Sequence, residues 1–300
     1  MRRILLSFAF LFYFSFSNAE ELLGFSVITT GASAGSLEAM VVDGGGYFTV
    51  RKLVHPAVLV EHPNGTLLWD TGLGIELNAQ MESFSWADQQ LFKVVDHMPA
   101  RQQLIEAKYD ISSIDMIVPS HMHWDHISGL EDFSPIPVWV QEASFQEASK
   151  GAPPAFVASQ FDDPKINWEF ITLEGGLYEG FEHSRDVFGD GSVVLVDTSG
   201  HSHGHLGMFV NLSDSERFFF IGDTTWVLEG VQMNRSRPWL IKKLVGVDVD
   251  FEKNANVVEQ MHALMRDKPE IQFVPAHDER VVAGLPAFPE FKRADVRLSR

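Results

Sequence analysis

Five short apolar runs in this chain are each followed, within five residues, by an aspartate or a histidine. The runs are residues 66–69, 116–118, 193–196, 218–221 and 271–274. The polar residues that follow them, in the same order, are Asp70, His121, His201, Asp223 and His277. In open α/β sheets, ligands gather beyond the carboxyl ends of strands, on loops that the sheet holds rigid. The sequence therefore predicts an α/β fold that collects these five loops into one site.

The pattern between these runs predicts stacked sheets covered by helices. Residues 57–61 and 66–69 flank Pro63-Asn64-Gly65, which is typical of a β-hairpin turn. Another apolar run, residues 207–210, also reads as a strand. The clearest helix is predicted near residue 260, where apolar side chains recur on one face. They are Val257, Val258, Met261, Leu264 and Met265.

The first nineteen residues have the pattern of a secretory signal. Arg2 and Arg3 precede an apolar run over residues 4–16, and small residues lead to Ala19. The alternative is a membrane anchor, but the run is too short to cross about 30 Å of hydrocarbon as a helix. We therefore expect a signal peptide at 1–19, one domain over 20–300, no membrane span after cleavage, and a periplasmic or secreted protein.

Composition excludes several classes of function. The chain has 23 basic and 41 acidic residues, a formal net charge of −18, and no basic stripe. Such a surface repels phosphate backbones, so we expect no nucleic-acid partner. There is no cysteine. Disulfides, thiolate ligands and thiolate nucleophiles are therefore excluded, and any metal chemistry must use imidazole and carboxylate groups.

The segment His121-Met122-His123-Trp124-Asp125-His126 concentrates such groups. Two histidines two positions apart can chelate one ion, while the following Asp-His pair turns toward a second. Imidazole nitrogen and carboxylate oxygen are the ligands that zinc accepts in catalytic sites, where one position stays open for water. This segment predicts a metal-dependent enzyme.

The same segment resembles the HxHxDH signature of the metallo-β-lactamase superfamily, and the resemblance extends over residues 57–278. Asp70 in Trp-Asp-Thr-Gly matches the family's early aspartate, and residues 198–205 resemble its TPGHTPGH segment. Asp223 in Ile-Gly-Asp-Thr and His277 in Val-Pro-Ala-His-Asp match the two later ligands. The resemblance implies an αββα sandwich, in which two stacked mixed sheets are flanked by helices.

The resemblance also implies a role for each matching residue. The first metal would be held by His121, His123 and His201. The second would be held by Asp125, His126 and His277, with Asp223 bridging both ions. Asp70 would orient metal-binding groups from outside the site. We expect an outer or structural role for His205 as well, because metal-binding histidines usually need outer partners. The implied cofactor is two Zn²⁺ per chain, although this donor set also suits Fe, Mn or Co.

The reaction expected from such a site is hydrolysis. A hydroxide that bridges the metals would attack a lactone or ester carbonyl, with Asp125 and Asp223 as the catalytic carboxylates and Asp125 carrying the proton. Trp124 and Trp226 are expected in the substrate pocket, and the family's tyrosine is replaced by Trp226. We assign no role in the site to the remaining isolated histidines and expect His203 to be exposed. The isolated histidines are His55, His62, His97, His183 and His262.

Within the superfamily, the chain looks most like the N-acyl homoserine lactonases and their exported organophosphate-hydrolase relatives. About 50 residues separate the first aspartate motif from HxHxDH, and the last motif ends in Ala-His-Asp. A phosphotriester or aryl ester hydrolase and a glyoxalase II-like thioesterase are alternatives within the fold. Outside hydrolysis, an iron enzyme that uses oxygen and a metal-stabilised binding protein stay open. The expected partner is a small apolar lactone or ester, and a homodimer is compatible with the sequence.

Overall fold

The computed structural model describes residues 22–245 and 247–295. The predicted signal peptide, residues 1–19, lies outside the described residues. Among the described residues, no helix combines the length and the apolar character needed to cross a bilayer.

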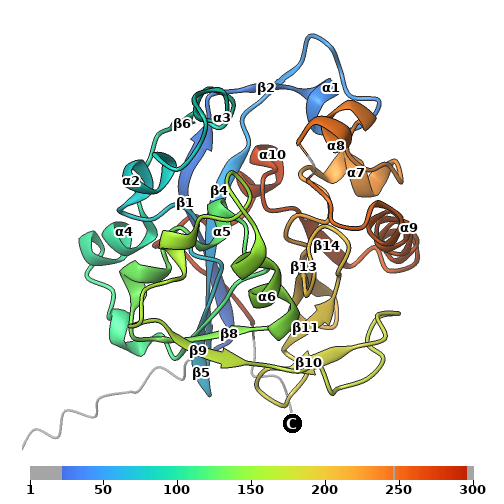
Figure 1. Ribbon diagram of the computed structural model, residues 1–300. Coiled ribbons are helices and arrows are strands. Elements are labelled where there is room, and N and C mark those ends of the chain that lie inside the picture. Colours follow the sequence, from blue (N-terminus) through green and yellow to red (C-terminus); the bar gives the residue numbers. More distant parts are fainter. Residues whose placement is uncertain (1–21, 246, 296–300) are drawn as a thin grey trace, which may run out of the picture.

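Two mixed sheets form the centre of the fold (Figure 1). The first has the order β15-β1-β4-β5-β7-β8-β9, and β6 also pairs with β1. Its strands are β1 (Gly24–Ser33), β4 (Val54–His62), β5 (Gly65–Trp69), β6 (Val94–Val95), β7 (Met116–Val118), β8 (Pro137–Val140), β9 (Asn167–Phe170) and β15 (Lys292–Arg293). The second has the order β10-β11-β12-β13-β14. Its strands are β10 (Ser184–Asp186), β11 (Val193–Asp197), β12 (Leu206–Ser213), β13 (Glu216–Phe220) and β14 (Ile271–Val274). A small ribbon pairs β2 (Ser36–Leu37) with β3 (Val50–Arg51).

Strand alternation separates the core between the sheets from the two outer layers. On β4, Val58 and Val60 point between the sheets, whereas Ala57 and Leu59 point to the outer face. On β12 of the second sheet, Met208 also lies between the sheets. Since side chains of a strand alternate between its faces, each sheet is buried on both sides and needs a helical cover.

Helices cover both outer faces. The first sheet is covered by α4 (Ala100–Glu106), α5 (Trp124–Ile127) and α6 (Glu142–Lys150). The second is covered by α7 (Leu228–Gln232) and α9 (Phe251–Asp267). The others are α1 (Glu38–Val41), α2 (Leu77–Met81), α3 (Trp86–Leu91), α8 (Trp239–Val245) and α10 (Glu279–Val282). The predicted αββα sandwich is therefore confirmed.

The predicted hairpin and the predicted helix near residue 260 are also confirmed. Pro63 and Asn64 connect β4 to β5 as a tight hairpin. Helix α9 begins after Asp250, whose side chain accepts a hydrogen bond from the backbone N–H of Lys253 and so caps the helix. The predicted apolar face of α9, including Met261, is buried against the second sheet.

Candidate metal centre

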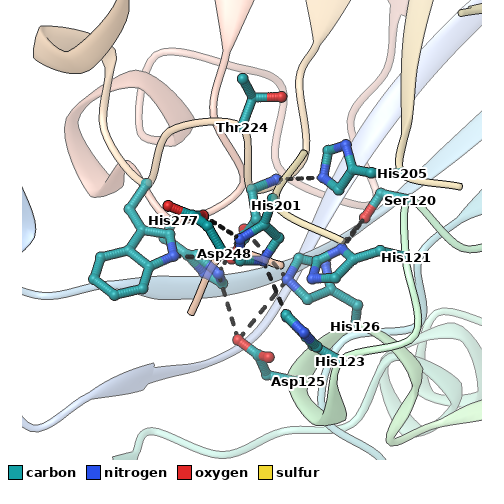
Figure 2. A network of polar contacts seen from close by, with 12 residues as sticks. Ser120, His121, His123, Asp125, His126, His201, His205, Thr224, Asp248 and His277 are labelled. Carbon is teal, nitrogen blue, oxygen red and sulfur yellow. Dashed lines mark hydrogen bonds and ion pairs between the residues drawn. The ribbon is translucent and has the colours of Figure 1, made fainter. Parts of the chain in front are cut away.

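The five predicted strand ends meet at one edge of the sandwich. Strands β5 and β7 run parallel, so the loops that carry Asp70 and His121 leave the first sheet at the same edge. In the second sheet, β13 and β14 are parallel and β11 runs in the same direction, since both β11 and β13 are antiparallel to β12. Figure 2 shows that the histidine rings from the two sheets converge on one space. All seven residues predicted as ligands lie there together.

One group of donors consists of three histidines from both sheets. His121 and His123 lie in the loop after β7, and His201 lies in the loop after β11. Their ring nitrogens can lie within 4.8 Å of one another, and His201 Nε2 is 3.0 Å from His123 Nδ1. This group matches the predicted first metal site.

Asp223 faces two sets of histidines with its two carboxylate oxygens. Oδ2 is 3.5 Å from His201 Nε2, whereas Oδ1 is 3.4 Å from His126 Nε2 and 2.9 Å from His277 Nε2. The turn before Asp223 needs glycine, because Gly222 has a φ of +51° and a Cβ there would lie 2.8 Å from His205 Nε2. This arrangement suits a carboxylate that serves two ions.

Asp125 lies beside the second set. The short helix α5 begins directly after His123 and carries both Asp125 and His126, which turns them away from the first group. Asp125 Oδ2 is 3.4 Å from His277 Nε2, 3.9 Å from His126 Nε2 and 3.1 Å from His55 Nδ1. His55 was not expected here, and the interpretation of it as an isolated histidine is wrong.

Four of the histidines have a hydrogen-bond acceptor at Nδ1, the ring nitrogen that points away from the shared space. These contacts pair His121 Nδ1 with Ser120 Oγ at 3.0 Å, His126 Nδ1 with Asp70 at 2.9 Å, His201 Nδ1 with Asp248 at 2.9 Å, and His277 Nδ1 with the carbonyl of Val54 at 2.7 Å. Outer partners of this kind fix the tautomer and ring orientation of metal-binding histidines. Nε2 of each ring is thereby directed at the shared space.

The two residues predicted as outer partners contact the expected neighbours. Asp70 contacts His126, and its Oδ1 also accepts the backbone N–H of Ser120 at 2.6 Å. His205 is fully buried, and its Nε2 accepts the backbone N–H of Asp223 at 3.0 Å. His203, by contrast, is exposed, as predicted.

The electrostatics of this cluster favour added positive charge. Burial lowers the pKa of His121 well below its ordinary value, so this ring is neutral. Burial opposes protonation of His126 as well, but Asp70 and other carboxylates outweigh it and hold the pKa of His126 well above its usual range. Burial would raise the pKa of Asp223, yet His277 and His126 hold that pKa well below its usual range. Buried carboxylates of this kind need cationic partners.

Three of the inward-facing atoms also lack hydrogen bonds. His121 Nε2, His126 Nε2 and Asp223 Oδ1 are buried and have no hydrogen-bond partner in the part of the chain that the structure describes. Leaving a buried polar atom unsatisfied costs about 1–3 kcal/mol. Imidazole and carboxylate donors that face one another in this way fit divalent metal ions. The residues present therefore suit a metal cofactor.

A cavity of about 500 Å³ opens above the cluster. Its base includes His123, Asp125, His201, Asp223 and His277. Most of its wall is apolar, and the apolar residues include Leu37, Met40, Leu53, Leu91, Phe92 and Ile241. Such a cavity can enclose a small substrate with a substantial apolar portion.

Both tryptophans predicted for the pocket line this cavity. Trp124 is buried, and its ring centroid is 5.8 Å from that of His55. Trp226 also contacts a candidate ligand. Its indole N–H donates to Asp223 Oδ2 at 2.9 Å, so this donor is engaged by the carboxylate rather than free for a substrate.

Three further residues were missed by sequence reasoning or left undecided. Asp248, the outer partner of His201, also accepts from Arg237 Nη1 at 2.5 Å, and Arg237 lies with its guanidinium carbon 4.6 Å from the centre of the Trp226 ring. Neither Asp248 nor Arg237 stands in a motif that would have indicated it. Asp278 is buried, where it caps α10 and pairs with the fully buried Arg51 at 2.9 Å. The sequence left a supporting and a surface position equally open for Asp278, and its burial decides against the surface.

Comparisons with known proteins identify the fold and its relatives. The model of the Metallo-beta-lactamase superfamily matches residues 50–277. An N-acyl homoserine lactonase, AttM, from Rhizobium radiobacter is 25% identical over 242 residues, which cover 79% of this chain and 86% of AttM.

Two solved structures share the fold. The first is an N-acyl homoserine lactone hydrolase with the product N-hexanoyl-L-homoserine bound at its catalytic metal centre. It aligns with a TM-score of 0.67 at 18% identity, covering 90% of this chain and 99% of that one. The second is AidC, a dizinc quorum-quenching lactonase, which aligns with a TM-score of 0.57 at 14% identity, covering 92% of this chain and 92% of that one.

The order of the motifs, the sandwich and the converged His/Asp cluster agree with these matches. The relatives are metal-dependent hydrolases, as the sequence predicted. This chain belongs to the metallo-beta-lactamase superfamily, within which its relatives include N-acyl homoserine lactonases.

Proposed function

We propose that this protein is an exported, dinuclear metal-dependent hydrolase that opens lactones bearing an apolar acyl chain. The observation that carries the proposal is the position of Asp223 beneath the cavity. Its two oxygens face different histidine groups, at 3.5 Å from His201 and at 2.9 Å from His277. The likeness to N-acyl homoserine lactonases supports the choice of substrate.

The candidate ligands divide into two sets that share Asp223. His121, His123 and His201 would hold one ion, and Asp125, His126 and His277 would hold the other. Zinc is the proposed metal, because the donors are imidazole and carboxylate and a solved relative of the same fold is a dizinc enzyme. Two bound divalent ions would make a water acidic enough to attack at neutral pH and would polarise the substrate carbonyl.

The chain's own residues bind and orient the substrate and move the proton. The apolar wall, including Leu37, Leu91 and Phe92, would hold the acyl chain and exclude water from the reacting end. Asp125 lines the cavity next to His277, within reach of a leaving oxygen at the base. We assign to Asp125 the transfer of a proton to that oxygen.

A second candidate is hydrolysis of aryl esters or phosphotriesters. The aromatic faces of Trp124 and Trp226 in the cavity wall favour it, because they suit an aromatic leaving group. The same donors would serve either reaction, so the substrate panel must decide between them.

The test is metal analysis joined to a substrate panel. Purified protein should contain two zinc ions per chain and should hydrolyse acyl lactones faster than aryl esters, thioesters and phosphotriesters. His201→Ala should lose activity and metal, whereas the matched control His203→Ala, in the same loop but exposed, should behave like the wild type. Full activity with one ion or none would refute the two-metal proposal. If phosphotriesters are hydrolysed faster than every lactone, phosphotriesters replace lactones as the proposed substrate class.

Export is a separate part of the proposal. The pattern of residues 1–19 supports cleavage after Ala19 and a periplasmic or extracellular destination. Mass spectrometry of protein recovered from its natural host should give a chain that begins at Glu20. A mature chain that retains Met1 would overturn this part alone.

A further inference from the structure

His55 lies in the cavity wall next to Asp125, although it is 70 positions earlier in the chain. Its Nδ1 is 3.1 Å from Asp125 Oδ2, and the side chain is 7% exposed. The ring is packed between two neighbours, with centroids 5.1 Å from His277 and 5.8 Å from Trp124. A polar ring held in this place needs a partner, and Asp125 is the partner that the structure gives it.

The backbone at His55 is fixed by contacts that do not depend on the side chain. Thr30 Oγ1 donates to the carbonyl of His55 at 2.5 Å and accepts the N–H of Leu73 at 2.8 Å. Gly72 approaches this pair so closely, at a φ of +57°, that no Cβ would fit beside Thr30. The start of β4 is therefore a rigid support.

The same strand end holds His277. The carbonyl of Val54 accepts from His277 Nδ1 at 2.7 Å, and the N–H of Val54 donates to the carbonyl of His277 at 3.3 Å. Two consecutive residues of β4 thus contact two of the candidate ligands of the second site. Val54 contacts His277, and His55 contacts Asp125.

Tautomers decide which ring can donate to Asp125. His277 must carry hydrogen on Nδ1, because a carbonyl oxygen can only accept, and His126 carries hydrogen on Nδ1, which faces the Asp70 carboxylate. In the proposed centre, Nε2 of each of these two rings would serve the second ion, so neither ring could donate to Asp125. Within the described residues, His55 Nδ1 is the remaining side-chain donor in contact with this carboxylate.

We infer that His55 is a positioning residue for Asp125: its Nδ1–H donates to Oδ2 and holds the carboxylate in the orientation in which it would bind the second ion. The inference rests on the proposed function for the role of Asp125, but the contact and its effect on metal binding do not require a particular substrate. Donation from a ring nitrogen that keeps its hydrogen also excludes that nitrogen as a metal ligand.

The experiment compares His55→Asn with His55→Leu. The amide nitrogen of asparagine is as many bonds from Cβ as Nδ1 of histidine, so His55→Asn keeps a donor where His55→Leu has none. The matched control is His62→Leu, a second buried histidine on β4 that pairs with Asp190, away from the centre. Thermal unfolding of each variant establishes that it is folded.

Zinc affinity of the second site is measured by competition with a chelator, and its environment by the spectrum of Co²⁺-loaded protein. We expect His55→Leu to bind the second ion about tenfold or more weakly, as is usual when an outer partner is lost. His55→Asn should restore most of the affinity and the Co²⁺ spectrum, and His62→Leu should match the wild type.

Hydrolysis supplies the second readout. His55→Leu should lower kcat with little change in KM, and the loss should be larger for lactones, whose leaving group is an alkoxide, than for nitrophenyl esters. Wild-type affinity and kcat in His55→Leu would overturn the inference, as would His55→Asn behaving like His55→Leu, which would make the ring itself a ligand or a packing group. If the wild type hydrolyses none of the substrates, the proposed function is refuted. The zinc measurements would still test whether His55 positions Asp125.

Discussion

Replacement of Asp248 by alanine tests how the centre is supported from outside. The carboxylate lies between two cationic or donor groups, with His201 Nδ1 at 2.9 Å and Arg237 Nη1 at 2.5 Å from the same oxygen, Oδ1. Asp248 is 5% exposed and Arg237 is 2% exposed. Arg237 also donates to the carbonyl of Asp223 and stacks on Trp226. Asp248→Ala therefore leaves one buried guanidinium without its carboxylate and one candidate ligand without its outer partner.

Each loss has an expected magnitude. Breaking a buried ion pair by removing one partner destabilises a protein by about 3–5 kcal/mol, since the other charge stays buried. Removing the outer partner of a metal-binding histidine lowers metal affinity by about 10–100-fold. We expect metal-free Asp248→Ala to lose about 3–5 kcal/mol of unfolding free energy. Arg237→Met should lose a similar amount, because it leaves the carboxylate of Asp248 unpaired.

The assay is urea unfolding of metal-free protein for both single variants and for the double variant. If the pair is coupled, the double variant should lose less than the sum of the single variants by about 2 kcal/mol or more. The control is Asp43→Ala, which breaks an ion pair with Arg235 whose side chains are 55% and 52% exposed. That change should cost less than about 1 kcal/mol. Additive losses at Asp248 and Arg237 would refute the reasoning.

Three other perturbations have defined outcomes. Asp223→Ala should lose one ion and nearly all hydrolysis, because each of its oxygens faces a different group of histidines; native mass spectrometry that shows two ions would remove Asp223 from the bridge. Trp226→Ala should lower kcat/KM selectively for lactones with long acyl chains, whereas Trp226→Phe, which keeps an apolar ring, should preserve the ranking by chain length. Both variants lose the donor to Asp223, so a loss in Trp226→Ala, relative to Trp226→Phe, that is equal at every length would show that the ring does not hold the acyl chain. Burial raises the pKa of Asp132 to about 6, so between about pH 4 and pH 6 this group keeps a proton in the folded state that it has released in the unfolded state. The contribution of Asp132 to stability therefore falls as pH rises through that window. Asp132→Asn should gain stability relative to the wild type over the same window, and a pH-independent difference in urea unfolding would contradict this.

The ligand loops could be predicted because their signal is local. The first candidate ligand after each of β7, β11, β13 and β14 follows an apolar run within five residues, and so does the supporting Asp70 after β5. A strand fixes where the next residue lies. The helix α9 was predictable for the same reason, since its buried face recurs with the helical period. Local patterns of this kind can be recognised without knowing which distant residues the segment contacts in the fold.

The supporting residues could not be predicted, because only the tertiary fold brings them to the centre. His55 lies at the start of β4 rather than after the end of a strand, and its partner Asp125 is 70 positions away. Asp248 is 47 positions from His201 and stands in an acidic stretch before α9, where Asp250 is the residue with a recognisable role as helix cap. The sequence indicates one property of His55: the following Pro56 favours an extended backbone at this position. It does not indicate where the side chain lies.

The distribution of the ligands between the sheets links metal binding to the stability of the sandwich. His121, His123, Asp125 and His126 come from the first sheet, whereas His201, Asp223 and His277 come from the second. Each proposed ion would therefore draw ligands from both sheets, and the chain has no cysteine that could join them by a disulfide. A ligand that binds only the folded state at 1,000 times its Kd stabilises that state by about 4 kcal/mol. Two ions would then contribute a large part of the roughly 5–15 kcal/mol that is typical of a folded protein. In this arrangement the groups that perform the chemistry would also hold the two halves of the core together.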